Sequence, residues 1–150
     1  MKVAIVHDWL TGMRGGERCL EAFCELFPDA DLYTLLHIKG TVSPTIERHR
    51  ITTSFVQSFP LAARYYRYYL PVFPFAIERF RLPSYDLVLS SSHCVAKGIR
   101  PPAGGKHLCY IHSPMRYVWD QFDNYARGGR SGVVARLGME LFRKRLQAWD

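Results

Sequence analysis

The feature that most constrains the fold is an apolar run near the start of the chain, followed by a glycine-rich turn and an amphipathic helix. Residues 3–6 read Val-Ala-Ile-Val without a polar interruption. A strand carries such a run when both faces of its sheet are covered by helices, as in parallel sheets. Residues 11–16 are turn-like, and residues 17–27 place apolar side chains at helical spacing. The sequence therefore predicts a strand–turn–helix unit at the N-terminus.

The rest of the chain alternates strand signals with helical stretches. Further strands are expected at residues 31–37, 50–53, 85–90 and 106–111, and further helices at 115–125 and 132–149. Residues 61–80 read as helical, but Pro71 and Pro74 must break or kink any helix there. The order is β-α-β, a helical insertion, then β-α-β and helices, and right-handed crossovers make the strands parallel. We predict one α/β domain, with a Rossmann-like, doubly wound, mostly parallel sheet and helices on both faces.

Composition and charge narrow the partners and the compartment. The 150 residues carry a net charge of +7, which favours anionic partners: phosphates, nucleic acid or an anionic membrane surface. No apolar run is long enough to span a bilayer, and the first one is too short for a signal peptide. We therefore expect a cytoplasmic protein. The four cysteines have no metal-type spacing, so reduced, mostly buried thiols are expected rather than a metal site or disulfides.

The glycine-rich turn is the first candidate for chemistry. Gly15 and Gly16 precede a helix whose free N–H groups and positive dipole end favour an anion, and Arg14 adds a charge. The pattern is neither G-x-G-x-x-G nor a P-loop, which disfavours a common dinucleotide or ATP site. Taken alone, the turn fits a phosphate site and a plain tight turn about equally well.

Histidines follow three of the predicted strands. They occur in His7-Asp8, in Ser91-Ser92-His93 and in Ile111-His112. Ligands of open α/β sheets bind outside the carboxyl ends of the strands. A single histidine there is more often structural, but three of them beside a glycine turn favour a functional site.

A third group interleaves arginine with aromatic side chains in residues 64–75. Such side chains stack on bases or sugars, or lie at a membrane interface. The alternative is an amphipathic helical hairpin with half-buried tyrosines, which we favour for most of these residues. Its exposed face would still be able to touch lipid or acceptor.

Three stretches together resemble a known family. Residues 3–36, 85–102 and 109–120 look like the N-terminal domain of the large retaining GT-B glycosyltransferases, family four, which includes bacterial mannosyltransferases of polysaccharide assembly. The likeness covers nearly the whole chain. It implies a two-domain enzyme that moves a hexose, mannose being one candidate, from a nucleotide sugar to a glycan or a lipid-linked acceptor. It also implies that neither a metal nor a cofactor is needed.

The resemblance assigns roles to particular residues. Gly15 and Gly16, with Arg14 beside them, correspond to the donor-diphosphate site. His112 corresponds to the catalytic-site histidine near the transferred sugar. The remaining cleft or acceptor candidates are Asp8, Trp9, His93, Lys97, Arg116 and Trp119.

The same resemblance leads us to expect a truncated protein. The family's C-terminal domain holds most of the donor, and residues 1–150 do not include one. We therefore expect this acceptor-side domain alone to be inactive. The alternative is a non-catalytic Rossmann-like module that binds a nucleotide or a glycan. The basic residues form no nucleic-acid-binding signature, so no nucleic acid is expected. They would favour the anionic inner face of the plasma membrane, where the protein would be peripheral.

Overall fold

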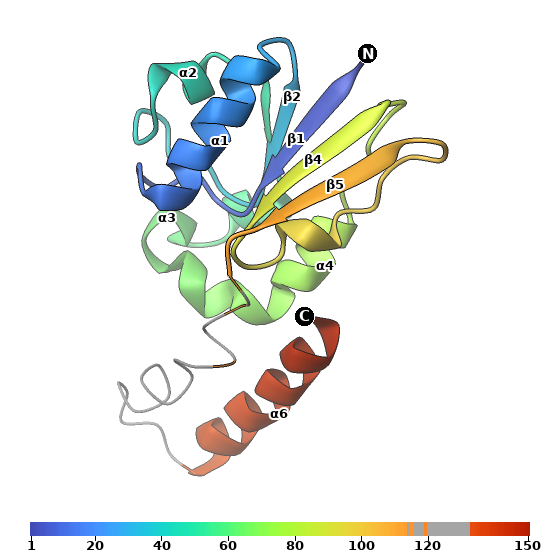
Figure 1. Ribbon diagram of the computed structural model, residues 1–150. Coiled ribbons are helices and arrows are strands. Elements are labelled where there is room, and N and C mark those ends of the chain that lie inside the picture. The colour runs from blue at the N-terminus through green and yellow to red at the C-terminus, as the bar shows by residue number, and fades with distance from the viewer. Residues whose placement is uncertain (114, 116–118, 120–132) are drawn as a thin grey trace.

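The computed structural model describes residues 1–113, 115, 119 and 133–150. In this part of the chain, one parallel sheet has the strand order β3-β2-β1-β4-β5 (Figure 1). The strands are β1 (Val3–His7), β2 (Asp31–Thr34), β3 (Ile51–Thr53), β4 (Leu87–Ser92) and β5 (Lys106–Ile111). The predicted α/β class with a parallel, Rossmann-like sheet is confirmed.

Helices connect the strands and follow them. The α-helices are α1 (Gly15–Leu26), α2 (Pro44–Glu47), α3 (Ala62–Tyr65), α4 (Phe73–Glu78) and α6 (Val133–Trp149), and the 3₁₀ helices are η1 (Phe55–Ser58), η2 (Tyr66–Val72) and η3 (Ala96–Gly98). Proline divides the helical insertion as expected, because Pro71 lies in η2 and Pro74 in the first turn of α4. No described helix is both long and apolar enough to cross a bilayer.

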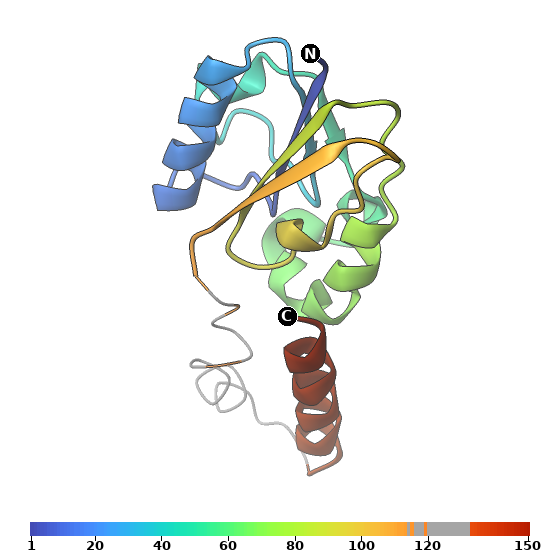
Figure 2. The same ribbon diagram turned by 45° about the vertical axis from the view of Figure 1, so that its right-hand side comes forward.

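The apolar run of β1 supplies both cores. Val3 and Ile5 pack on one face of the sheet with Leu20 and Cys24 of α1. Ala4 and Val6 belong to the core on the other face, which includes Ile77 of α4. Neighbouring side chains of a strand point to opposite faces, so an uninterrupted apolar run fits a sheet that is covered on both sides. Figure 2 shows α1 and α4 on opposite sides of the sheet.

Several predicted boundaries were wrong. Helix α1 begins at Gly15, two residues earlier than expected, and β2 ends at Thr34. Strand β4 runs on through Ser92, because Ser91 pairs with His7 of β1 and Ser92 pairs with Ile111 of β5. The expected helix between these last two strands is only the short η3. The helix predicted at 115–125 falls almost wholly outside the described residues.

The order of the strands fixes where a ligand site is expected. From β1 the chain builds outward through β2 to β3, whereas β4 lies on the other side of β1 and leads to β5. The connections therefore diverge between β1 and β4. Open α/β sheets bind ligands at the carboxyl ends of the strands at such a switch point.

Candidate functional site

Three histidines meet at the carboxyl ends of β1, β4 and β5, against the first turn of α1. The nearest neighbours of a Cβ placed on Gly16 would be His7 Cε1 at 3.5 Å, His93 Nδ1 at 3.8 Å and His112 Nε2 at 3.9 Å. We call these three residues the histidine cluster. A single methyl group fits in this space, but a branched side chain would have to displace an imidazole. Glycine at position 16 therefore lets three strand ends and a helix N-terminus approach one another.

His7 is the buried member of the cluster. Its Nδ1 lies 3.1 Å from the carbonyl oxygen of Ser91. Since a carbonyl can only accept, Nδ1 carries the proton and donates it to this bond. The opposite ring atom, Nε2, makes no hydrogen bond in the described part of the chain and lies 3.8 Å from Oε1 of Glu17. A buried imidazole nitrogen without a partner needs an explanation, and a bound ligand is one such explanation.

Ser91 links two members of the cluster, and sequence reasoning did not single it out. Its Oγ lies 3.2 Å from His7 Nδ1 and 2.9 Å from His112 Nε2. The bridge follows from register, because Ser91 is the partner of His7 in the β1–β4 pair. Only the strand pairing could have revealed it.

His112 and His93 are partly exposed, and their surroundings favour the neutral form. Burial lowers the pKa of His112 below its usual value, and the neighbouring His7 adds to this effect. Burial also lowers the pKa of His93, although the carboxylate of Asp8 acts in the opposite direction. Neutral imidazoles can donate to a ligand oxygen or accept from a ligand hydroxyl.

Asp8 organises the loop that carries His93. It is fully buried, and its two carboxylate oxygens accept the backbone N–H groups of residues 93–96 at 2.6–3.0 Å. Its Oδ2 also lies 3.0 Å from Nδ1 of His93. We expected Asp8 to line the acceptor side. Its carboxylate oxygens instead bind the loop of residues 93–96, which covers them.

Trp9 is likewise a packing residue in this structure. Only 2% of it is exposed, and its ring contacts those of His93, Tyr66 and Phe73. The shortest of these ring–ring distances is 4.5 Å, to His93. Trp9 thus supports the histidine cluster from behind instead of lining an open acceptor surface.

Glu17 lies in the first turn of α1 and is buried, although it is a charged residue. Its Oε2 accepts the backbone N–H of Arg14 at 3.0 Å, which is half of a helix-capping arrangement. Burial raises the pKa of Glu17, but the interaction with His7 and the Arg14 N–H outweigh it, so that the pKa lies below its usual value. In the sequence, the position of Glu17 three residues after Arg14 was the signal that could have predicted this capping arrangement.

The first turn of α1 supplies N–H donors beside the cluster. The first bond within the helix runs from Arg18 N–H to the Arg14 carbonyl, so the N–H groups of Gly15 and Gly16 have no acceptor inside the helix. A helix N-terminus of this kind favours a negative charge. The side chain of Arg14 is exposed next to this turn. The structure thus brings Gly16 close to His93 and His112, and Gly15 and Arg14 directly precede it in the chain.

Two other predicted residues gather elsewhere. Lys97 forms an ion pair with Asp150, and Trp119 donates its indole N–H to the same carboxylate at 2.9 Å. Both therefore meet at the residue that follows α6. Arg116 lies outside the described residues.

Compared with known proteins, the chain matches no family model, no curated protein and no solved structure. Its own geometry is therefore the basis for choosing a site. Of the described residues, no group of three or more His, Cys, Asp or Glu side chains is arranged to hold a metal ion.

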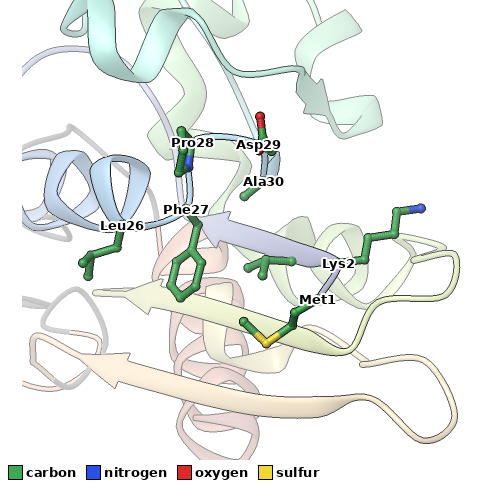
Figure 3. A pocket seen from close by; sticks show the side chains of 8 residues that line it. Met1, Lys2, Leu26, Phe27, Pro28, Asp29 and Ala30 are labelled. Carbon is green, nitrogen blue, oxygen red and sulfur yellow. The ribbon is translucent and has the colours of Figure 1, made fainter.

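A hollow of about 450 Å³ lies at the opposite, amino end of β1. Figure 3 shows it between the end of α1 and the start of β1, with Met1, Leu26 and Phe27 among its lining residues. Its charged side chains are Lys2 and Asp29. The histidine cluster is the stronger candidate, because it combines titratable groups, helix N–H donors and the carboxyl ends of strands.

Proposed function

We propose that the chain is the acceptor-side half of a sugar-nucleotide-dependent, retaining glycosyltransferase. It would move a hexose to a hydroxyl of a glycan or a lipid-linked acceptor. The observation that carries the proposal is the approach of three histidines to Gly16 at the start of α1. This arrangement offers N–H donors to a phosphate and imidazoles to sugar hydroxyls. The three stretches that resemble retaining GT-B enzymes support the substrate class.

The role of the α1 N-terminus follows from where charge develops. As the bond between the sugar and the diphosphate breaks, negative charge grows on the departing oxygen. Donors that are already in place stabilise this charge without the cost of reorganising solvent. The N–H groups of Gly15 and Gly16 are such donors, and Arg14 would add a cation at the rim. No covalent intermediate on this chain is required.

His112 is the residue we assign to the transferred sugar. Ser91 holds its Nε2, and no described residue bonds its Nδ1. Nδ1 is thus the ring atom for a sugar hydroxyl, with the ring oriented through Ser91 and His7. His93, fixed by Asp8 and Trp9, would form the adjoining wall.

A transfer assay tests this function. Because we expect residues 1–150 alone to be inactive, the assay uses the full-length, two-domain protein that the proposal implies. This protein is incubated with a panel of nucleotide sugars and with glycan and lipid-linked acceptors, and the released nucleoside diphosphate and the product are quantified. Gly16→Val should displace an imidazole and lower the rate by about 100-fold or more, the range for loss of a transition-state donor. His112→Ala should also lower it sharply.

His107→Ala is the matched control, because His107 is a partly buried histidine within β5 and bonds Ser90 instead of Ser91. Its transfer rate should stay close to that of the unaltered protein. Unchanged rates in Gly16→Val and His112→Ala would refute the site. Binding of a nucleoside diphosphate without transfer from any donor would favour the non-catalytic module.

A further inference from the structure

Large apolar side chains are exposed on the helical insertion between β3 and β4. Tyr68 is 80% exposed, Leu61 69% and Phe75 57%, and Phe55 and Tyr65 are also exposed. We call these five residues, together with Arg64 and Arg79, the arginine–aromatic surface. They belong to η1, α3, η2 and α4, and to the turn before α3. Several large apolar groups exposed in one region typically mark an interaction site.

Ring contacts join several of these exposed residues to their neighbours. Phe75 contacts Phe55, which contacts Phe59, with ring centroids 5.9 and 5.6 Å apart. Phe59 contacts Tyr69 at 4.8 Å, and the hydroxyl of Tyr69 donates to the Pro60 carbonyl at 2.7 Å. Pro60 immediately precedes Leu61. Phe55 and Phe75 thus lie in one row of packed rings that leads to the residue before Leu61. Tyr65 and Tyr68 form a second pair, with ring centroids 6.0 Å apart.

Leu61 has an unusual backbone. Its φ of 52° and ψ of 28° lie in the left-handed region, which favours glycine. The side chain that is held there is mostly exposed, so packing inside the protein does not explain a leucine. A strained backbone conformation that no packing inside the protein compensates points to a function. A leucine presented outward at a turn is suited to insertion into an apolar medium.

The charged side chains of this segment are mostly positive. Residues 55–81 contain four arginines and one acidic residue, Glu78, which pairs with Arg100. The guanidinium of Arg79 lies over the ring of Phe75, and that of Arg64 over Tyr65, both at 5.3 Å. The cations therefore border the exposed rings.

We propose that the arginine–aromatic surface docks on an anionic lipid bilayer. Leu61 and Tyr68 enter the headgroup region, and the arginines contact lipid phosphates. Apolar and aromatic side chains bordered by cations bind membrane interfaces in this way. An exposed, strained leucine distinguishes this surface from a platform for stacking bases. The inference is independent of the proposed enzymatic function, because it uses none of the residues of the histidine cluster.

Vesicle co-sedimentation of the full chain tests the proposal. One set of vesicles is phosphatidylcholine alone, and the other contains phosphatidylglycerol as well. The chain should bind the anionic vesicles more strongly, and added salt should weaken that binding. Equal binding to both sets, or none to the anionic set, would overturn the proposal.

Two pairs of variants separate the apolar and the charged contributions. Leu61→Gly suits the left-handed backbone, so the protein should stay folded while its vesicle binding falls. Leu26→Gly is its control, since Leu26 of α1 is 70% exposed elsewhere. Arg64→Glu should weaken binding at least about fivefold. Arg48→Glu, the same charge change at the end of α2, should weaken it less.

Single-stranded DNA serves as the competing polyanion. DNA binding as strong as vesicle binding, and unaffected by Leu61→Gly, would show a surface for polyanions and would contradict docking on a bilayer. Loss of vesicle binding in Leu61→Gly but not in Leu26→Gly supports the proposal. Equal loss in both would overturn it.

Discussion

Ser91 has the most informative hydrogen bonds of any single residue in the candidate site. Its hydroxyl lies within hydrogen-bond distance of His112 Nε2 and of His7 Nδ1, and its carbonyl accepts from the same His7 nitrogen. A fully buried serine in this position fixes how both rings are turned. The orientation of His112 therefore depends on β4 as well as on its own strand.

Ser91→Ala should release His112 from this orientation. The loss of the hydroxyl leaves His112 Nε2 without this partner, whereas His7 Nδ1 keeps its bond to the Ser91 carbonyl. A buried group left in this way costs about 1–3 kcal/mol, and the partly exposed His112 should lie at the lower end. We expect the ¹⁵N resonances of the His112 ring to change, together with a lower free energy of unfolding. Ser90→Ala is the matched control, because Ser90 bonds His107 at 2.8 Å and should alter that ring instead. His112 resonances that are the same in Ser91→Ala and in the unaltered protein would contradict the bridge.

Strands β4 and β5 and the residues that directly follow them carry three histidines whose pKa values are lowered by burial. This applies to His93, His107 and His112, all relative to a usual value of 6.5. The unfolded chain therefore takes up protons on these residues at a higher pH than the folded chain. The contribution of the neutral histidines to stability is present at neutral pH and is lost as the pH falls through this range.

Urea denaturation should therefore show a falling free energy of unfolding between about pH 7 and pH 5. Glu17 acts in the same direction only below its usual pKa of 4.5, because its own pKa is lowered. Above pH 5, the change in the free energy of unfolding with pH is therefore assigned to the histidines and not to Glu17. The double variant His93→Gln/His112→Gln should show a smaller slope with pH, with His107 retaining its share. An identical slope in the double variant would show that these two residues do not control the pH dependence.

The elements were largely predictable from the sequence, whereas the details of the site were not. The run Val3–Val6 predicts a buried parallel strand, because a strand that is covered on both faces needs apolar residues throughout. The glycine turn and the three strand-end histidines were also visible. The burial of Asp8 and Glu17 and the bridge through Ser91 depend on strand register and on a loop folded over a carboxylate. Neither follows from local periodicity.

For the whole molecule, the histidine cluster and the arginine–aromatic surface are adjoining parts for which we propose different ligands. Trp9 packs against His93 on one side and against Tyr66 and Phe73 of the helical insertion on the other. In Figure 1 this insertion lies beyond the carboxyl ends of the strands. Because the histidine cluster and the arginine–aromatic surface lie close together, a test must show whether ligand binding at one depends on the other.

We expect the two activities to separate by mutation. Leu61→Gly should lower vesicle binding and leave the affinity for a nucleoside diphosphate unchanged, because Leu61 contacts no member of the histidine cluster in the described structure. Gly16→Val should do the reverse. Isothermal titration and co-sedimentation on the same preparations measure both quantities. A parallel loss of both in either variant would mean that the two surfaces form one site.

The central claim is that the first turn of α1 and the histidine cluster bind the diphosphate of a sugar donor. The most direct measurement is an NMR titration of the chain with a nucleoside diphosphate. We expect the largest shifts at the backbone amides of Gly15 and Gly16 and at the rings of His93 and His112. Shifts centred on Met1 and residues 26–30 at the amino end of β1, or no shifts at the glycine turn, would contradict it.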